Sequence, residues 1–329
     1  MDINKFINTI IEGDTIKNLK RLPDESIDFI FADPPYYMQT EGELLRVDGT
    51  KFKGVEDKWD KFKDFKDYEN CIKISSDNKC IFKERGIHMY EREKDELQKI
   101  IDDSKNIVFF GGAGVSTESG IPDFRSADGL YHQEYKYSPE QIVSHSFFMR
   151  YPEAFYEFYK EKMICLDAKP NAAHIKLAEL EKAGRLKAVV TQNIDGLHQA
   201  AGSKTVYELH GSIHRNYCMK CGKFYDAKYV KDSKGIPYCS CGGMIKPDVV
   251  LYEEGLDGNV INSAIRAIAS ADTLIIGGTS LVVYPAAGFI DYFRGKHLVV
   301  INKSDTAKSV NAELYVNAPI GEVMSGIKV

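Results

Sequence analysis

Between residues 106 and 301 the sequence alternates short apolar runs with amphipathic segments of helical length. The apolar runs, which we expect to be strands, lie at Asn106–Phe110, Leu186–Thr191, Thr205–Leu209, Asp248–Leu251, Thr273–Ile276 and His297–Ile301. Helical patterns occupy Met89–Asp103, Asn171–Ala183 and Val260–Ala269. Buried strands separated by helices are typical of an α/β fold, because parallel strands need long crossover connections. The sequence therefore predicts a parallel sheet covered by helices.

Charge and hydropathy exclude several classes of protein. The 329-residue chain carries a net charge of −5, whereas a protein that mainly binds nucleic acid is usually basic. None of its apolar runs approaches the roughly 18 residues that a membrane span needs. The first residues lack the basic stretch and apolar run of a secretory signal. We therefore expect a cytoplasmic protein with no membrane partner, and we regard DNA binding as a poor match to its charge.

A glycine-rich turn follows the first of these strands. Gly112-Ala113-Gly114-Val115-Ser116 comes directly after the apolar run and is predicted to open a helix. Glycines in that position let the backbone approach a pyrophosphate, and a helix N-terminus attracts its charge. The turn alone leaves two interpretations open, a dinucleotide site and an ordinary tight turn.

The cysteines indicate a metal site. Four of the seven lie in two tight pairs separated by 17 residues, and these are Cys218, Cys221, Cys239 and Cys241. Two cysteine pairs joined by a loop of this size are typical of a zinc ribbon, in which four thiolates close a structural tetrahedral site. The second pair is one residue tighter than the commoner Cys-x-x-Cys. The other three cysteines (Cys71, Cys80 and Cys165) follow no such pattern and are interpreted as ordinary residues.

Six sequence blocks in a fixed order carry a family resemblance. They are GAGVSTESGIPDFRS from Gly112, TQNIDGLH from Thr191, ELHG from Glu208, KPDVVL from Lys246, GTSL from Gly278 and IN from Ile301. This set resembles the sirtuin family over residues 89–329. The resemblance implies a Rossmann-like parallel sheet and a smaller domain made of a zinc ribbon, at about residues 212–247, and a helical insertion. It also implies an NAD-dependent protein-lysine deacylase.

The resemblance assigns most of these blocks to NAD. The residues that it places against the pyrophosphate, riboses or adenine are Ala113, Arg125, Gln192, Gly278, Ser280 and Asn302. Gly112, Gly114, Ser116, Thr279 and Lys303 complete the expected cofactor site. The nicotinamide pocket is expected to hold Ile121, Asp123, Asn193 and Asp195, and Phe124 to cover the reactive ribose. A dry, polar-lined pocket suits a glycosidic bond that breaks toward a cationic sugar, because water would consume the intermediate.

His210 is the expected general base, with Asn193 and Asp195 as further catalytic residues. His145 and His174 lie in helical patterns, where ordinary packing explains them, whereas His210 ends a strand and precedes a glycine. The resemblance implies that the acetyl oxygen attacks the ribose and that His210 then activates a ribose hydroxyl. The implied products are nicotinamide, O-acetyl-ADP-ribose and the deacetylated lysine. Imidazole suits this step because its pKa lies near neutrality.

The resemblance also assigns the acyl substrate. Val249, Val250 and Tyr252, with Phe124, are expected to bind an acetylated protein or peptide that pairs as an added strand; the alternative is an ordinary core strand. Sirtuins that prefer acidic acyl groups carry a Tyr-x-x-Arg pair. The matching stretch begins at Tyr156 and lacks the arginine, so we expect deacetylation rather than desuccinylation.

The front of the chain resembles another family. Residues 26–60 resemble the start of a DNA adenine methyltransferase through Asp33-Pro34-Pro35-Tyr36, a loop that holds a flipped adenine in that family. The likeness ends near residue 70, before any methyl-donor site. Phe110-Gly111-Gly112-Ala113-Gly114 fits a donor-site pattern, but its continuation belongs to the sirtuin blocks. We therefore expect residues 1–88 to be a truncated, non-functional segment and residues 89–329 to be the catalytic domain.

Two alternatives remain open on the sequence. One is protein ADP-ribosyl transfer or NAD hydrolysis in the same cofactor pocket. The other is a DNA-binding or DNA-modifying fusion that acts through residues 1–70. The predicted zinc ribbon and peptide strand favour the deacetylase, because an enzyme that only hydrolyses NAD needs neither.

Overall fold

The computed structural model describes residues 91–123, 137–303 and 311–329, which belong to the unit Tyr90–Val329. The front segment and the residues Phe124 and Arg125 lie outside the described residues. Within the described part of the chain, every helix is too short or too polar to cross a bilayer.

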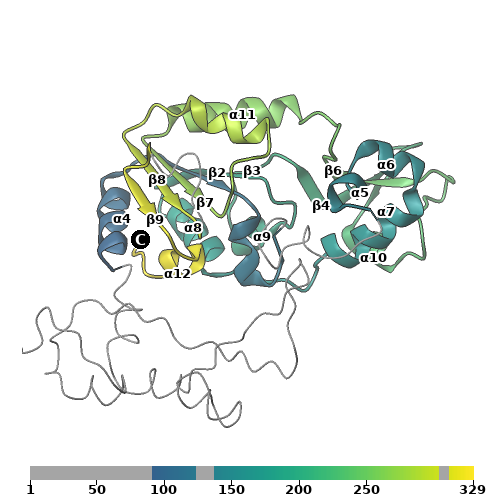
Figure 1. Ribbon diagram of the computed structural model, residues 1–329, viewed down its shortest axis with the longest axis horizontal. Coiled ribbons are helices and arrows are strands. Elements are labelled where there is room, and N and C mark those ends of the chain that lie inside the picture. The colour runs from purple at the N-terminus through teal and green to yellow at the C-terminus, as the bar shows by residue number, and fades with distance from the viewer. Residues whose placement is uncertain (1–90, 124–136, 304–310) are drawn as a thin grey trace, which may run out of the picture. The chain divides into compact units, whose positions relative to one another are not determined.

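The larger sheet has six parallel strands in the order β3-β2-β1-β7-β8-β9 (Figure 1). Its strands are β1 (Ile107–Gly111), β2 (Leu186–Thr191), β3 (Val206–Glu208), β7 (Thr273–Gly277), β8 (His297–Ile301) and β9 (Leu314–Val316). The chain builds outward from β1 in one direction through β2 and β3, and later returns to the other side of β1 through β7. The expected α/β fold with a parallel sheet is confirmed.

Helices cover both faces of this sheet because its central strand β1 is apolar at every position and β7 is apolar after its first residue. In β1, Ile107 and Phe109 face one core, while Val108 and Phe110 face the other, and all four are fully buried. Alternation of this kind follows from the two-residue period of a strand. The first core packs against α4 (Glu91–Asp103), α8 (Ala172–Lys182) and α12 (Ile320–Ser325). The second packs against α11 (Gly258–Ser270) and a 3-10 segment at Ala286–Tyr292.

A smaller lobe has its own antiparallel sheet, in the order β5-β4-β6. Its elements are α5 (Pro139–Ile142), α6 (His145–Arg150), α7 (Pro152–Phe158), a π-helical turn (Tyr159–Met163), β4 (Gly211–Cys218), β5 (Phe224–Tyr225), α10 (Ala227–Asp232) and β6 (Ile245–Val249). Aromatic rings fill its core, with Phe148 and Tyr156 packed edge-on against Phe155. Two separate stretches of sequence form this lobe, one before α8 and one after β3.

Two sequence-based expectations need correction. The strand expected at Asp248–Leu251 runs instead at Ile245–Val249, since after Val249 the chain turns through Glu253 at φ 75°. The helix expected after Gly112 is only a pair of 3-10 turns, Ala113–Val115 and Thr117–Ser119. The second turn ends at Gly120 in the left-handed conformation, and an α-helix cannot continue through it.

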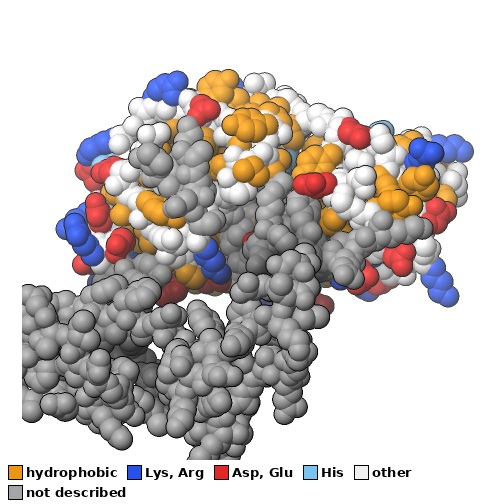
Figure 2. Space-filling view, viewed as in Figure 1, with side chains coloured by type: hydrophobic (Ala, Val, Ile, Leu, Met, Phe, Trp, Pro, Cys, Tyr) orange, Lys and Arg blue, Asp and Glu red, His pale blue; other side chains and the backbone are white. Residues whose placement is uncertain are grey.

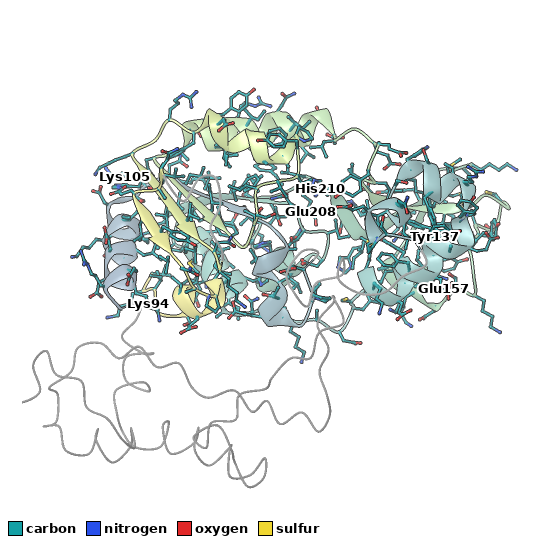
Figure 3. The ribbon with its side chains drawn as sticks, viewed as in Figure 1. Lys94, Lys105, Tyr137, Glu157, Glu208 and His210 are labelled. Carbon is teal, nitrogen blue, oxygen red and sulfur yellow. The ribbon has the colours of Figure 1, made fainter. Side chains whose placement is uncertain are left out.

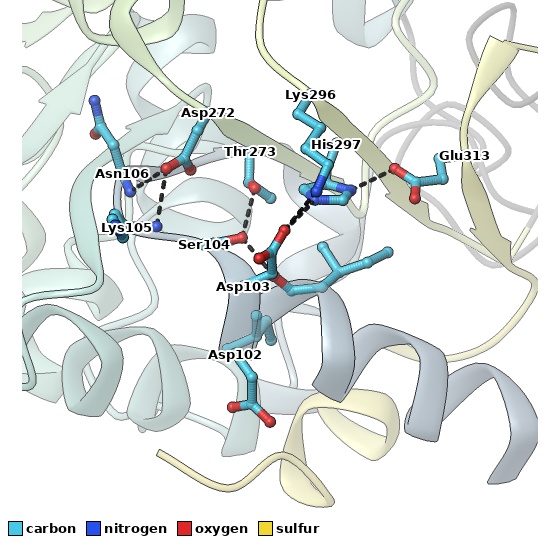
Figure 4. Close-up of polar contacts among 12 residues, drawn as sticks. Asp102, Asp103, Ser104, Lys105, Asn106, Asp272, Thr273, Lys296, His297 and Glu313 are labelled. Atoms are coloured by element: carbon cyan, nitrogen blue, oxygen red, sulfur yellow. Dashed lines mark hydrogen bonds and ion pairs between the residues drawn. The ribbon is translucent and has the colours of Figure 1, made fainter.

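Polar contacts fasten the amino ends of the large sheet (Figure 4). The Asp272 carboxylate accepts hydrogen bonds from the backbone N–H groups of Lys105 and Asn106, both at 2.9 Å. The His297 ring lies between the Glu313 carboxylate, at 2.6 Å, and the Asp103 carboxylate, at 3.2 Å. These contacts join the end of α4 to β8 and β9 at the edge opposite to the carboxyl ends of the strands.

Two histidine rings lie in the core beside α8. His174 and His198 are almost completely buried, with ring centroids 4.7 Å apart. Burial lowers the pKa of His174 to about 4 and that of His198 to about 3, so both rings are neutral in the folded protein near neutral pH. In the unfolded chain the same imidazoles have a pKa near 6.5, so the unfolded state binds more protons than the folded state in mild acid.

This pair predicts a loss of stability in mild acid. Because the folded pKa values are depressed, the free energy of unfolding falls as pH drops below about 6.5, by roughly 4 kcal/mol for the two rings between pH 7 and pH 5. Urea denaturation at the two pH values measures this difference. In His198→Gln the difference in the free energy of unfolding between pH 7 and pH 5 should be about half as large, because one titrating ring remains. Equal free energies of unfolding at pH 7 and pH 5 in the unsubstituted protein would contradict the account.

Candidate functional site

The chain reverses direction across the sheet between β1 and β7, so the carboxyl ends of these two strands mark the switch point of the sheet. In open parallel sheets, ligands bind at this point. The turn after β1 packs directly on the turn after β7, since the Gly112 N–H donates to the Gly277 carbonyl at 3.2 Å and the Gly114 N–H to the Gly278 carbonyl at 2.8 Å. A Cβ atom on Gly114 would lie 2.8 Å from the Gly278 Cα atom, so this approach requires glycine.

Three polar side chains form a connected network beside this turn. The Ser116 hydroxyl donates to the Asp195 carboxylate at 2.7 Å and accepts from the Asn193 amide at 3.0 Å. Asp195 also accepts the backbone N–H of Leu197 at 2.9 Å, which fixes the start of α9 (Leu197–Ala201). Ser116 and Asn193 are buried. Sequence positions about 80 residues apart therefore form one polar cluster, whose donors and acceptors suit a neutral polar group such as a carboxamide.

Other expected cofactor residues lie on loops that follow the strands. Gln192, directly after β2, donates from its side-chain amide to the Thr279 hydroxyl at 3.0 Å. Asn302 follows β8, and its backbone N–H donates to the Val316 carbonyl at 3.0 Å. The side chains of Ser280 and Lys303 are exposed. The structure thus gathers residues from the ends of β1, β2, β7 and β8 at one edge of the sheet.

His210 lies between the two lobes, just after β3. Its Nδ1 atom is 3.0 Å from the Gln192 carbonyl oxygen, which can only accept, so Nδ1 carries the proton and Nε2 keeps its lone pair. Burial lowers the pKa of His210, and this bond opposes the shift. The ring is therefore a neutral, oriented proton acceptor at physiological pH.

A salt-bridge network holds the backbone on both sides of His210. The Arg215 guanidinium bonds the Glu208 carboxylate through Nη1 and the Asp248 carboxylate through Nε, each at 2.7 Å. Figure 3 shows Glu208 close to His210, at the junction of the large sheet and the smaller lobe. The backbone completes the link, because the Val250 N–H donates to the His210 carbonyl at 3.0 Å. These bonds fix His210 relative to Val250.

Gly211 is the tightest backbone position of this junction. It has φ 74°, and a Cβ atom built on it would lie 1.9 Å from the Asp248 carbonyl oxygen. We expect Gly211→Ala to lower the free energy of unfolding by about 3 kcal/mol or more, from left-handed strain and the clash together. Urea denaturation measures the change.

Gly184→Ala is the matched control, because Gly184 has a similar φ of 77° and a Cβ atom placed on it would have no atom within 4 Å. Gly184→Ala should lower the free energy of unfolding only by the left-handed backbone strain, about 1–2 kcal/mol. Equal losses for the two variants would show that the Asp248 contact does not constrain Gly211.

An open groove of about 530 Å³ is lined in part by Tyr252, two residues after Val250. Its walls come from α5 and its N-cap, from the turn after β6, and from the loop after β7. The lining residues are Ser138, Glu140, Gln141, Ser144, Tyr252, Glu253, Val282, Val283 and Tyr284. Sequence reasoning included Tyr252 but missed the wall formed by Val282 to Tyr284. An apolar run that follows Gly-Thr-Ser without forming a strand was the available signal.

The expected peptide-binding residues differ in exposure. Val249 is buried, pairs with Gly211 and packs in the core of the smaller lobe. Val250 is half-buried beside His210, and Tyr252 is 39% exposed. Val250 and Tyr252 therefore have surface available to a ligand, while Val249 supports the strand behind them.

The four paired cysteines meet in the smaller lobe, where Cys218 ends β4. The sulfur atoms of Cys218, Cys221, Cys239 and Cys241 all lie within 4.8 Å of one another. The Cys218–Cys241 distance is 3.4 Å and the Cys221–Cys239 distance is 3.6 Å. Sulfur atoms bound to one zinc ion at about 2.3 Å in a tetrahedron would be about 3.8 Å apart. The cluster therefore fits a structural zinc, and the tight Cys-x-Cys spacing does not prevent this geometry.

Comparison with known proteins agrees with this geometry. The model of the Sir2 family matches residues 112–285. An NAD-dependent protein deacetylase of Clostridium perfringens is 65% identical over 236 residues, which cover 70% of this chain and 97% of that relative. The protein of the same name from Clostridium acetobutylicum is 62% identical, with 70% and 96% covered.

Solved structures give the same result. A Sir2 complex with a deacetylated p53 peptide and acetyl ADP ribose is 39% identical, with a TM-score of 0.66, and covers 71% of this chain and 99% of that one. A Sir2 complex with a p53 peptide and NAD⁺ is 41% identical, with a TM-score of 0.63 and coverages of 70% and 94%. The glycine turns, the polar network, His210 and the cysteine cluster all lie within the part that matches. The chain therefore belongs to the Sir2 family.

Proposed function

We propose that the chain is an NAD-dependent protein-lysine deacetylase that produces nicotinamide, O-acetyl-ADP-ribose and deacetylated lysine. The observation that carries this proposal is the position of His210. It follows β3 at the carboxyl end of the large sheet, its backbone carbonyl accepts the Val250 N–H, and its Nδ1 bond leaves Nε2 as a proton acceptor. The deacetylases of two Clostridium species, at 65% and 62% identity, support the same activity.

The switch point between β1 and β7 suits NAD. Its close-packed glycines let a pyrophosphate approach the backbone, and we assign Gly112, Ala113, Gly114, Gly278 and Thr279 to that part of the cofactor. The remaining contacts toward the riboses and adenine are assigned to Arg125, Gln192, Ser280, Asn302 and Lys303. NAD would supply the ribose carbon that accepts the acyl oxygen and the nicotinamide that leaves.

The polar network is assigned to the nicotinamide end. Asn193 and Asp195 would bind the carboxamide with Ile121 and Asp123 beside them, while Ser116 holds both side chains in place. Preorganised polar groups of this kind stabilise developing charge without reorganising during the reaction. Phe124 is assigned to cover the reactive ribose and exclude water.

His210 would accept a proton from a ribose hydroxyl through Nε2. The Nδ1 bond to the Gln192 carbonyl keeps the ring in the required tautomer, and the lowered pKa keeps it unprotonated. Val249, Val250 and Tyr252 would position the acetylated segment, with Val249 acting from within the strand.

The smaller lobe favours a neutral acyl group. Sirtuins of the acidic-acyl type use an arginine that this chain lacks after Tyr156, and Lys160 is one position away from the place of that arginine. The Lys160 ammonium is already saturated, because its three donors reach the Ser233 carbonyl (2.6 Å), the Ser233 hydroxyl (2.7 Å) and the Gly235 carbonyl (2.6 Å). An acyl carboxylate would therefore enter without a partner, and such burial is strongly unfavourable.

The front segment is assigned no part in this reaction. Residues 1–88 resemble a truncated DNA adenine methyltransferase without a methyl-donor site, so we propose neither methyl transfer nor DNA binding for it, and we place the catalytic domain at residues 89–329. The cytoplasm is the compartment that we propose for the protein.

Turnover of two matched peptides tests the proposal. The purified chain would be mixed with NAD and with one peptide carrying either acetyl-lysine or succinyl-lysine. We expect NAD-dependent loss of the acetyl group, and a kcat/KM at least about 100-fold lower for succinyl-lysine, the magnitude of a missing charged partner. NAD cleavage with the acetyl peptide untouched would place the protein among NAD hydrolases. A peptide that gains ADP-ribose would make it a transferase.

A further inference from the structure

A side-chain hydrogen bond ties the turn after β1 to the start of α8, a helix to which no cofactor contact is assigned. Asn171 donates from its amide Nδ2 to the Val115 carbonyl at 2.7 Å. Val115 directly precedes Ser116, whose hydroxyl joins the two side chains assigned to the carboxamide of nicotinamide. Building on the proposed function, we propose that Asn171 is a positioning residue for the nicotinamide end of NAD, and that it acts through Ser116.

Asn171 is the N-cap of α8, and this helix is fixed in the core of the large sheet. The Asn171 amide oxygen accepts the backbone N–H groups of Ala173 at 3.0 Å and His174 at 3.5 Å, which orients the side chain at the helix start. Its Nδ2 group therefore faces the turn after β1. Helix α8 holds this position because three of its side chains are completely buried in the core that also packs on β1, namely Ala173, Leu177 and Leu180.

The turn after β1 benefits from a donor outside itself. It consists of two short 3-10 turns, Ala113–Val115 and Thr117–Ser119, with Ser116 between them. A 3-10 turn has poorer hydrogen-bond geometry than an α-helix, so contacts from other elements help to hold it in one conformation. The Val115 carbonyl and the Ser116 nitrogen belong to one planar peptide unit. A donor on this carbonyl therefore fixes the direction in which the Ser116 side chain leaves the backbone.

The orientation of Ser116 matters because its hydroxyl serves two partners at once. It donates its single proton to the Asp195 carboxylate at 2.7 Å and accepts from the Asn193 amide at 3.0 Å. Ser116 and Asn193 are buried, so a broken bond here would leave polar groups unpaired inside the protein. Rotation of the peptide unit before Ser116 would break these bonds. The preorganisation of Asn193 and Asp195 therefore depends on the Asn171 side chain.

The start of α8 also approaches the nicotinamide end through His174. The His174 Nδ1 atom accepts the Asn171 backbone N–H at 3.3 Å. Burial lowers the pKa of His174, and the negative charge of Asp195 opposes that shift, so the ring lies within electrostatic reach of this carboxylate. The His174 ring also lies 4.7 Å from that of His198 on α9, the helix whose first N–H group Asp195 accepts. The start of α8 is thus connected to both ends of the Ser116 network.

Two substitutions separate the helix cap from the bond to Val115. In Asn171→Asp, the carboxylate can still accept the N–H groups at the start of α8, but it has no proton to donate to the Val115 carbonyl. Asn171→Ser is the second variant, because serine also caps a helix but is too short to reach Val115. Thermal denaturation without ligand should show both variants folded, with Tm within about 5 °C of that of the unsubstituted protein.

Two ligands separate the nicotinamide end from the rest of the cofactor site. A carbocyclic NAD analogue contains nicotinamide but cannot release it, and ADP-ribose has the same pyrophosphate and adenine without nicotinamide. Calorimetric titration in the presence of an acetyl-lysine peptide gives the Kd of each ligand. We expect Asn171→Asp to raise the Kd of the NAD analogue about 10-fold and that of ADP-ribose less than about threefold. Asn171→Ser should raise the Kd of the NAD analogue about fivefold.

Asp257→Asn is the matched control, because it exchanges the same two residue types at another N-cap. The Asp257 carboxylate accepts the backbone N–H groups of Asn259 at 2.8 Å and Val260 at 3.0 Å at the start of α11. Helix α11 covers the face of the sheet opposite to α8, and Figure 2 shows hydrophobic and charged side chains at the surface over it. Both Kd values should stay within about twofold of those of the unsubstituted protein, because aspartate and asparagine cap equally well.

The outcomes separate this inference from the function on which it rests. Equal rises in the two Kd values in Asn171→Asp would overturn it, because Asn171 would then act on the whole cofactor site. Unchanged Kd values in both folded Asn171 variants would also overturn it, as would an equal rise in Asp257→Asn. A protein that binds the NAD analogue but deacetylates no peptide would overturn the proposed function, and the two Kd values would still decide the role of Asn171. Absence of binding of both ligands would overturn the two proposals together.

Discussion

Replacing His210 with alanine is expected to lower kcat for deacetylation by about 10²- to 10⁴-fold, the usual contribution of a positioned general base. The physical reason lies in the hydrogen bond of Nδ1 to the Gln192 carbonyl, which presents Nε2 as the acceptor. NAD binding should change little, because the glycine turns and the polar network do not depend on this ring. Single-turnover kinetics and NAD titration measure the two effects separately.

The pH profile should identify the same ring. Because burial lowers the pKa of His210 below its ordinary value near 6.5, the basic form persists into mild acid. We expect kcat/KM to stay constant from pH 8 to about 6.5 and to fall only as pH drops further. The acid limb should disappear from the residual activity of His210→Ala.

His297→Gln is a matched control for these measurements, since His297 lies at the opposite edge of the sheet, between Asp103 and Glu313 (Figure 4). It should keep the acid limb and the order of magnitude of kcat. A loss of kcat below tenfold in His210→Ala, or an acid limb that survives in it, would remove His210 from the role of general base.

Removing the metal should unfold the smaller lobe. A four-thiolate zinc site contributes folding free energy outright, about 10–16 kcal/mol in isolated zinc-finger peptides. We expect Cys239→Ser to abolish binding of one zinc per chain and to lower Tm by more than about 10 °C. Activity should fall as well, because β4 and β6 connect the cysteine cluster to the His210–Val250 junction. Metal analysis, thermal denaturation and peptide turnover measure the three effects.

Cys165→Ser provides the control for thiol loss, because Cys165 lies outside the cluster and its thiol contacts only the Lys162 carbonyl, at 3.9 Å, among the hydrogen bonds of the described residues. It should keep the zinc and nearly the same Tm. If Cys239→Ser retained a full equivalent of zinc and its Tm, the four-cysteine site would be wrong.

The parallel sheet was predictable because its strands are apolar on both faces. Runs such as Thr273–Ile276 and His297–Ile301 match β7 and β8 almost residue for residue. Strand β9 was missed, since Leu314–Val316 is only three residues long and carries no distinct period. The shifted strand β6 has another cause, because the chain turns after Val249 through Glu253 at φ 75°, and no local pattern predicts that turn.

The candidate site was likewise predictable only in part. Blocks of contiguous residues reveal the glycine turn, the cysteines and His210. The structure places the glycine turn and His210 after strands of the large sheet, and the cysteines in the smaller lobe. Networks made by distant residues do not show in the sequence. Two such features are the ion pairs of Arg215 with Glu208 and Asp248, and the groove wall at Val282 to Tyr284. Both depend on contacts between the two lobes, and no local sequence pattern predicts those contacts.

The fate of the acetyl group tests the central claim most directly. A peptide whose acetyl-lysine carries ¹³C in the acetyl group would be incubated with NAD and the purified chain, and the products would be followed by mass spectrometry. The account predicts labelled O-acetyl-ADP-ribose in equal amount to nicotinamide and deacetylated peptide. Labelled free acetate as the first product, or unlabelled ADP-ribose with the peptide intact, would contradict it.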